Sequence, residues 1–299
     1  MSFTGEHATA RKWAESFRGA SQCPPFSFNY GEHPSAEFLA SWRREVGTGG
    51  NEDGFMTETY LYAGADGLSV QAELKVHSDF PALEWVIHLK NNGAADTPLV
   101  EGLQALDATI PLLASARCAL RYSKGALCLP EDFMPCDCSL VPKGSLRFQP
   151  GGGRSSSEFL PFFNFDFGGH GFILAIGWTG EWAAEFTRDG TGALRIRAGM
   201  DITKLTLRPG EEIRTPRILL IFWEGERICG HNLLRRFILK HHRPKANGKP
   251  VAGPLCNMNW GATPAEVHLD NIRQIIKHDL QLLIRILVLI FYSHKYLIF

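Results

Sequence analysis

Two neighbouring stretches alternate apolar and polar side chains with a period of two, and this pattern restricts the fold more than any other feature of the chain. Apolar residues occupy every second position from Leu68 to Val76 and again from Leu83 to Leu89. A β-strand with one buried face has this period, because successive side chains point to opposite faces of the sheet. The proline of "SDFP" (78–81) is typical of a turn. The sequence therefore predicts two strands joined by a short turn.

The β pattern continues to about residue 225. The apolar run "GFILAIGW" (171–178) is bounded by glycine and predicts a buried strand that enters a hairpin. Two further strand-like runs flank Pro209 and Gly210. Turn signals separate these runs at intervals that suit a large sandwich. We therefore expect an all-β sandwich over residues 1–229.

A helical pattern begins at Gly230. The apolar residues between Leu233 and Ile238 fall on one helical face, and Pro244 ends the run. The following residues are rich in glycine and proline, which is typical of a connector. The sequence predicts a linking helix and connector over residues 230–253.

A short strand candidate at residues 254–260 leads into a second helical pattern. Thr263 and Glu266 form a capping box, and Pro264 occupies the first helical position. A strand, a short loop and a helix make the first βα unit of an α/β domain, and such a unit needs further units to bury its strand. We assign residues 254–280 to the start of such a domain.

The composition excludes several classes of function. The chain has 31 basic and 31 acidic residues, so no net charge draws it to nucleic acid or to an anionic membrane. Cys136 and Cys138 lack a second cysteine pair at ligand spacing, so no metal site is predicted. There is no nucleotide-binding motif, and no cofactor is expected. The N-terminus lacks the apolar region of a secretory signal, which favours a cytoplasmic location.

Two places offer side chains to a ligand. "GGGRSSS" (151–157) presents Arg154 and three hydroxyl groups, and it is either a plain surface loop or a ligand-binding loop. Trp260 follows the strand candidate. It either packs under the next loop or stacks on a sugar face while Asn259 binds a hydroxyl group. The residues alone leave these alternatives open.

Eight segments occur in a fixed order over roughly residues 25–280. They are "FSFNYG" (26–31), "DFPALEWVIHLKN" (79–91), "LVEGLQALD" (99–107), "GGGRSSSEFLPFFN" (151–164), "AIGWTGEW" (175–182), "RAGMD" (197–201), "LRPGEEIRTPRILLIFWEG" (207–225) and "NLLRRFI" (232–238). In this order they resemble the N-terminal part of the melibiase-type α-galactosidases, which are clan D retaining glycoside hydrolases.

The resemblance implies a mainly β fold, with a large antiparallel β-supersandwich, a linking helix and the start of a (β/α)8 barrel. It implies oligosaccharides with terminal α-linked galactose as substrates, and homo-oligomers of the full-length protein. Trp260 and Asn259 match the galactose pocket, although Gly261 stands where the family usually has Glu. Arg154 matches a loop near the barrel mouth, although residues 157–158 stand where the family often has His.

Catalysis by a retaining glycosidase needs two carboxylates about 5–5.5 Å apart. The resemblance implies that both lie on later barrel strands, beyond Phe299. We therefore expect no catalytic residue in this chain and interpret it as a truncated α-galactosidase that is inactive by itself. Four aspartates of the β region are given no catalytic role: Asp79, Asp107, Asp166 and Asp201.

The closing residues 281–299 are almost wholly apolar, and they contain no Gly, Ala, Asp or Glu. The abrupt change favours a segment foreign to the fold, produced by a frameshift, an intron read-through or an error in the gene model. A tail anchor is an alternative, since about 20 apolar residues span a membrane, but Arg285 and Lys295 oppose it. A non-catalytic carbohydrate-binding sandwich is the other alternative for the chain as a whole.

Overall fold

Two units make up the chain in the computed structural model, which describes residues 5–19, 23–52, 54–251 and 264–277. The first unit is Met1–Ile238 and the second is Leu239–Phe299. The first unit carries the large sheets, so the β region and the predicted loop site both belong to it.

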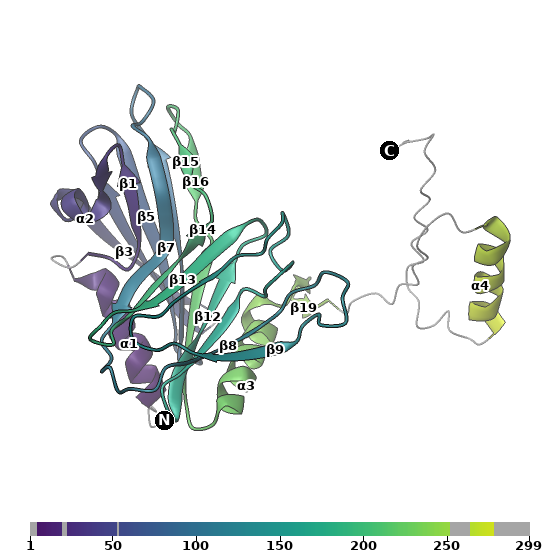
Figure 1. Cartoon of the computed structure of the whole chain (residues 1–299). Helices are drawn as coiled ribbons and strands as arrows, with labels where there is room; N and C mark the ends of the chain where they lie inside the picture. The colour runs from purple at the N-terminus through teal and green to yellow at the C-terminus, as the bar shows by residue number, and fades with distance from the viewer. Residues whose placement is uncertain (1–4, 20–22, 53, 252–263, 278–299) are drawn as a thin grey trace. The chain divides into compact units, whose positions relative to one another are not determined.

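Antiparallel pairing organises the first unit, whose described strands form one sheet of ten strands and one of seven (Figure 1). The larger sheet has the order β3-β4-β5-β6-β17-β12-β11-β8-β9, with β16 beside β6. Its strands are β3 (Arg43–Glu52), β4 (Phe55–Ala63), β5 (Leu68–His77), β6 (Ala82–Asn91), β8 (Ala119–Ser123), β9 (Pro135–Ser139), β11 (Phe162–Asp166), β12 (His170–Gly177), β16 (Glu212–Arg214) and β17 (Arg217–Glu224).

The smaller sheet has the order β10-β13-β14-β7-β1-β2, with β15 beside β7. Its strands are β1 (Ser27–Tyr30), β2 (His33–Pro34), β7 (Val100–Ile110), β10 (Ser145–Phe148), β13 (Trp182–Arg188), β14 (Leu194–Met200) and β15 (Lys204–Leu205). Two large antiparallel sheets confirm the prediction of a mainly β fold.

Strands β5 and β6 confirm the hairpin predicted from the alternating pattern. They pair antiparallel from Leu68 opposite Asn91 to Val76 opposite Leu83. The apolar positions of the pattern from Leu68 to Leu74 are fully buried, whereas the polar residues between them are half-buried. The period of two therefore marks the face that points into the sandwich.

The hairpin predicted after residues 171–178 is wrong. Strand β12 pairs with β11 on one side and β17 on the other, so neither of its edges is free for the next strand. The chain instead crosses to the other sheet, where β13 pairs with β10 and β14. A continuous apolar run indicates a strand buried on both faces, but it does not indicate which strands flank it.

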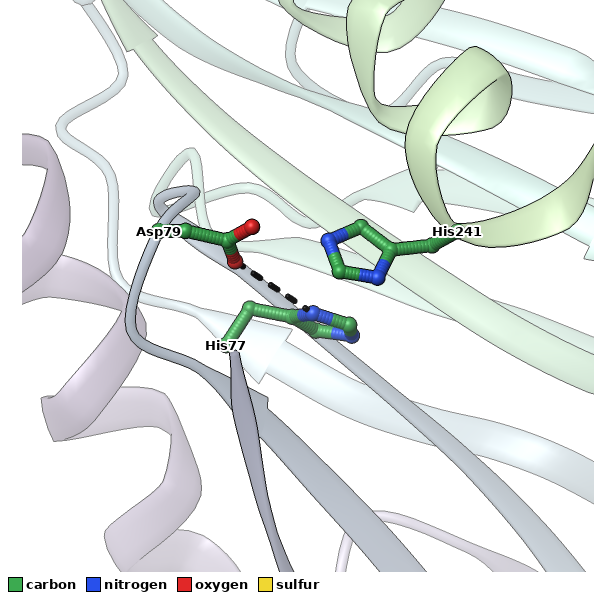
Figure 2. Close-up of side chains that lie close together, drawn as sticks. All are labelled: His77, Asp79 and His241. Atoms are coloured by element: carbon green, nitrogen blue, oxygen red, sulfur yellow. Dashed lines mark ion pairs between the residues drawn. The ribbon is translucent and has the colours of Figure 1, made fainter. Parts of the chain in front are cut away.

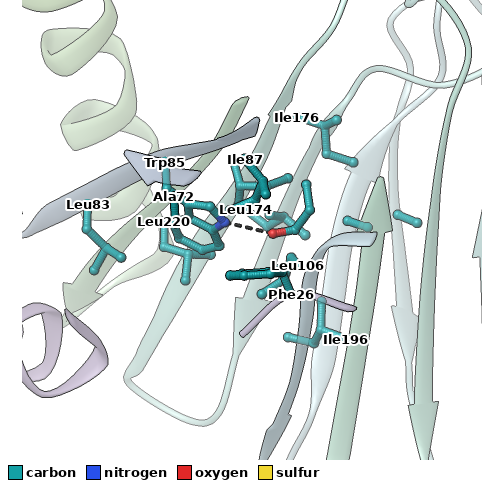
Figure 3. Close-up of a cluster of buried hydrophobic side chains, with 14 of the residues drawn as sticks. Phe26, Ala72, Leu83, Trp85, Ile87, Leu106, Leu174, Ile176, Ile196 and Leu220 are labelled. Carbon is teal, nitrogen blue, oxygen red and sulfur yellow. Dashed lines mark hydrogen bonds between the residues drawn. The ribbon is translucent and has the colours of Figure 1, made fainter. Parts of the chain in front are cut away.

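Trp85 joins the two sheets across the core (Figure 3). It lies on β6, is fully buried, and donates a hydrogen bond of 2.7 Å from Nε1 to the carbonyl oxygen of Ala105 on β7. Ala105 is the residue skipped where the register between β7 and β14 shifts, from Ala198 opposite Leu106 to Gly199 opposite Gln104. A bulged residue leaves a carbonyl group outside the sheet ladder, and Trp85 supplies its partner.

The prediction of an all-β chain up to about residue 225 is wrong at the N-terminus. Helix α1 (Gly5–Arg18) buries Ala10, Ala14 and Phe17 in the core between the sheets. The Phe17 ring packs edge-on against Trp85, with 5.4 Å between the ring centroids. The spacing of these residues, i, i+4 and i+7, is the helical signal in the sequence. Two short helical segments, α2 (Ser35–Phe38) and the 3-10 helix η1 (Leu39–Ser41), follow β2.

Helix α3 (Arg227–Phe237) confirms a helix at this place and begins three residues before Gly230, whereas its role as a link between domains stays a prediction. It packs on the outer face of the larger sheet, where Phe237 is fully buried against Leu219 and Ile221. A Cβ atom on Gly230 would lie 2.7 Å from the Trp223 ring, so only glycine allows this close approach of helix and sheet. A π-helical turn, η2 (Ile238–His242), follows α3 in sequence.

The second unit contains the hairpin of β18 (Lys245–Ala246) and β19 (Lys249–Pro250), and helix α4 (Ala265–Lys277). Helix α4 confirms the second predicted helix over these residues. Its Leu269 and Ile276 side chains are 52% and 54% exposed. The strand candidate 254–260 and the tail 281–299 lie outside the described residues, so the start of a barrel stays a prediction. Among the described helices, none is long and apolar enough to cross a membrane.

Buried charge fixes α1 to the larger sheet. Glu58 of β4 is 4% exposed and accepts hydrogen bonds from Arg18 of α1, at 3.0 Å from Arg18 Nε, and from the Tyr60 hydroxyl group. Burial raises the pKa of Glu58, but the hydrogen bonds from Arg18 and Tyr60 outweigh it and hold the pKa below the ordinary value of 4.5. The folded state therefore favours the ionised carboxylate.

Replacement of Trp85 tests its role between the sheets. In Trp85→Phe the Ala105 carbonyl oxygen loses its donor and a cavity forms, so we expect the free energy of unfolding to fall by about 2–4 kcal/mol. Urea unfolding followed by circular dichroism measures this change. The half-buried Trp178→Phe is the matched control, and an equal loss in both variants would contradict the role.

The pH dependence of stability tests the Glu58 contact. Because the folded pKa is depressed, the stabilisation is present above the unfolded pKa and is lost as the pH falls through the folded pKa. We expect Glu58→Gln to lose about 1–2 kcal/mol at pH 7, a value reduced by the partial exposure of Arg18, and to show a weaker decline in stability from pH 6 to pH 3 than the unchanged protein. Urea unfolding at both pH values measures this, and parallel pH profiles would refute it.

Candidate functional site

The polar loop 151–158 is tightly held to the body of the sandwich. Trp182, fully buried on β13, donates a hydrogen bond of 2.8 Å from Nε1 to the carbonyl oxygen of Ser155. The backbone N–H groups of Gly125 and Ala126 donate to the carbonyl oxygens of Glu158 and Ser156, both at 2.8 Å. One anchor lies on β13 of the smaller sheet and the other on the segment that follows β8 of the larger sheet. The loop is therefore held from two sides and has a defined shape.

Arg154 lies at the exposed tip of this loop, as expected from the sequence. Its Nη2 atom donates a hydrogen bond of 3.2 Å to the carbonyl oxygen of Ala126. Ser157, by contrast, is buried, and its hydroxyl group donates to the carbonyl oxygen of Gly152 at 3.4 Å. Among the four candidate side chains of the loop, Arg154 is exposed, Ser155 and Ser156 are half-buried, and Ser157 is buried.

A cleft of about 220 Å³ lies between this loop and the segment 124–134. Its polar lining includes Lys124, Glu131, Asp132 and Glu158. The backbone N–H groups of Leu127 and, more weakly, Leu129 and Cys128 lower the pKa of Asp132, and the positive charge of Arg154 adds to this effect. Asp132 is therefore ionised at neutral pH, and the cleft offers one cation, Lys124, and three carboxylates to a polar ligand.

The sequence analysis did not identify Lys124 or Asp132 as part of this site. The structure brings them to the loop because the isolated bridge between Lys124 and Phe159 joins two segments that are far apart in sequence. The sequence signal for Asp132 is "PED" (130–132), since a proline followed by acidic residues is typical of a turn. In the structure, the backbone N–H groups of Leu127 and Cys128 each donate a hydrogen bond of 2.9 Å to Asp132.

Trp260 and Asn259 lie outside the described residues, as does Gly261. Their assignment to a sugar pocket therefore stays a prediction.

The four aspartates that were given no catalytic role all have hydrogen-bond or ion-pair partners. The Oδ1 atom of Asp79 lies 3.8 Å from Nδ1 of the buried His77 (Figure 2). His241, which the figure also draws, belongs to the second unit. The other pairs are Asp107 with Arg195 at 2.9 Å, Asp166 with Arg117 at 3.1 Å, and Asp201 with Arg147 at 2.5 Å. Each of the four carboxylates thus has a structural partner, which accounts for these residues without a catalytic role.

Comparison with known proteins rests on the fold. No protein-family model matches the chain, and no curated protein matches it in sequence. A solved structure of a variant of the GH36 α-galactosidase AgaA from Geobacillus stearothermophilus, in complex with raffinose, matches with a TM-score of 0.67 at 16% identity. The match covers 90% of this chain and 39% of that chain.

Two further solved structures give the same result. The galactosidase domain of the α-galactosidase-sucrose kinase AgaSK matches with a TM-score of 0.64 at 14% identity, over 90% of this chain and 39% of that chain. The α-galactosidase from Lactobacillus brevis matches with a TM-score of 0.61 at 14% identity, over 86% of this chain and 37% of that chain. The chain thus has the fold of part of the GH36 α-galactosidases and spans less than half of their length.

Gly125 allows the close contact between the loop and segment 124–134. A Cβ atom at this position would lie 2.2 Å from the carbonyl oxygen of Ser157 and 2.3 Å from that of Ser156. We expect Gly125→Ala to displace the loop and to lower the free energy of unfolding by about 1–3 kcal/mol. Hydrogen exchange of residues 151–158, together with urea unfolding, measures the change. Gly153→Ala, which meets no atom within 4 Å, is the matched control and should leave both unchanged.

Proposed function

We propose that this chain is the N-terminal β region of an α-galactosidase-like glycoside hydrolase. In this proposal, hydrolysis is carried out by a catalytic barrel elsewhere in the complete protein. The single observation that supports this is the fold match over 90% of the chain to an enzyme of that activity, of which it spans 39%. At this low identity the fold alone is shared, so activity, substrate and assembly are parts of the proposal.

The proposed substrates of the complete protein are oligosaccharides with terminal α-linked galactose, such as raffinose and stachyose. AgaA structures in complex with these two sugars support the choice. In this proposal Trp260 stacks on the galactose ring while Asn259 binds a hydroxyl group. Arg154, exposed on an anchored loop, contacts the sugar or the barrel mouth.

The proposed mechanism of the complete protein is a retaining double displacement, which needs a nucleophile and an acid/base about 5–5.5 Å apart. In this proposal the described β region supplies neither group. Its four aspartates discussed above form ion pairs with arginine or lie beside His77. Its role is structural: it holds the linking helix α3 on the outer face of the larger sheet, at the point from which the chain continues.

A sugar-binding sandwich without catalysis is the second candidate function. The observation in its favour is the cleft of about 220 Å³ between loop 151–158 and segment 124–134, which Lys124 and three carboxylates line. Such groups hydrogen-bond sugar hydroxyl groups without any barrel.

One pair of measurements tests the proposal and separates it from the second candidate. We expect the purified 299-residue chain to release nitrophenol from a nitrophenyl α-galactoside no faster than an identical preparation from cells without the gene. We also expect isothermal titration with raffinose to give no saturable heat. Turnover above the control would overturn the structural role. Saturable binding that is lost in Arg154→Ala but kept in Arg147→Ala would instead favour the sugar-binding sandwich.

A further inference from the structure

A second cleft, separate from the loop site, lies between helix α3 and the outer face of strands β8, β9 and β11. It has a volume of about 120 Å³, and its lining includes Arg121, Asp137, Asn164, Arg227 and His231. The strands supply the first three of these residues and α3 supplies the other two. The cleft therefore lies where the linking helix meets the sheet.

Two of the residues that line this cleft each carry a buried nitrogen donor without a hydrogen-bond partner in the described part of the chain. They are Asn164 Nδ2 and Arg121 Nε, each with less than 1 Å² of accessible surface. Asn164 lies directly opposite Arg121 in the pairing of β11 and β8, so both donors come from one rung of the sheet. A buried donor without an acceptor is destabilising, so two at one place indicate an acceptor that binds there.

The orientation of Asn164 is fixed by its other atom. Its Oδ1 accepts a hydrogen bond of 2.9 Å from Trp223 Nε1, and Asn164 is 4% exposed. An exchange of the amide oxygen and nitrogen would set two N–H groups against each other. The Nδ2 atom is therefore a donor held in place by a fully packed tryptophan.

The charge around the two donors favours an anion. Arg121 and Arg227 line the cleft against one carboxylate, that of Asp137. Asp137 lies 2.7 Å from Arg121 Nη1 and 3.7 Å from Arg227 Nη1, but its side chain is 58% exposed. Arg121 Nη2 also lies 3.5 Å from Asp166, which Arg117 pairs from the other side. The lining itself holds two cations and one carboxylate, and the ion pairs around it, with Arg117 and Asp166 included, hold three cations and two carboxylates.

The charge state of His231 agrees with the excess of cations around the cleft. Partial desolvation of the imidazole, followed by the charges of Arg227 and Arg121, lowers the pKa of this otherwise exposed residue, whereas Asp137 opposes this effect. A neutral imidazole leaves the two guanidinium groups as the cations of the cleft and adds a further hydrogen-bonding group to the ligand.

We propose that this cleft binds a small oxyanion of the size of phosphate or a carboxylate. One oxygen accepts from Asn164 Nδ2 and Arg121 Nε, and a second meets Arg227 at the mouth of the cleft. The Arg227 and His231 side chains are exposed and line the cleft, so their rotation admits the anion, while the exposed Asp137 swings outward. The bound anion then links β8 and β11 to the linking helix.

Titration of the full chain with inorganic phosphate tests this site. Isothermal titration at constant ionic strength, with chloride as the replaced ion, should show saturable binding with one phosphate per chain. A parallel titration with acetate decides between a tetrahedral oxyanion and a carboxylate as the preferred ligand. Phosphate should also raise the unfolding temperature, because a ligand that binds only the folded state stabilises it. The absence of saturable binding for both anions would overturn the proposal.

Asn164→Asp is the decisive variant. The variant keeps the acceptor for Trp223 but replaces the Nδ2 donor by a carboxylate oxygen, which repels an anion. We therefore expect the Kd for phosphate to rise about tenfold or more. Asn92→Asp adds the same charge on an exposed turn and should leave the Kd unchanged. Unaltered binding by a folded Asn164→Asp variant, or an equal loss in Asn92→Asp, would refute the site.

A second pair of variants covers the case in which Asn164→Asp does not fold. Arg227 is exposed at the start of α3, so Arg227→Gln should fold and weaken phosphate binding severalfold. Arg147→Gln, which removes an exposed cation from the smaller sheet, is its matched control. Equal binding by both variants would overturn the role of Arg227 and with it the proposed cleft.

Discussion

The hydrogen bond from Trp85 to the carbonyl oxygen of Ala105 is the contact on which the sandwich depends. It connects β6 of the larger sheet to the bulged residue of β7 in the smaller one, and Phe17 of α1 packs on the same indole ring. Sheets twist and bulge independently, so a sandwich needs specific contacts that fix one sheet over the other. One fully buried side chain here fixes both sheets and the N-terminal helix.

The rigid core explains why the two clefts lie where they do. Trp182 reaches from β13 to Ser155 and holds the loop that carries Arg154. Trp223 reaches from β17 to Asn164 and holds the amide that faces the cleft under α3. In each case an indole N–H orients a polar group near the surface, because a buried tryptophan needs an acceptor for that one donor. The same residue type thus builds the core and shapes the places where ligands are proposed to bind.

Much of the fold could be predicted because it follows local periodicity. The β5–β6 hairpin, α3 and α4 all repeat their apolar residues at the period of their own structure. Strand β12 was recognised but its neighbours were not, since pairing depends on distant strands such as β17. Helix α1 was missed because the chain around it reads as β, although Ala10, Ala14 and Phe17 carry the helical spacing.

The sequence by itself determined the β5–β6 hairpin, helices α3 and α4, and the likeness to glycosidases, because period and motif order are local properties of the chain. It also pointed to Arg154, whose loop is marked by glycine and serine. Only the tertiary structure decided that Lys124 and Asp132 join that loop, and that Arg121 and Asn164 meet beneath α3. Each of these groups is brought together by strand pairing between distant segments, and register over such separations is set by the packing of whole sheets.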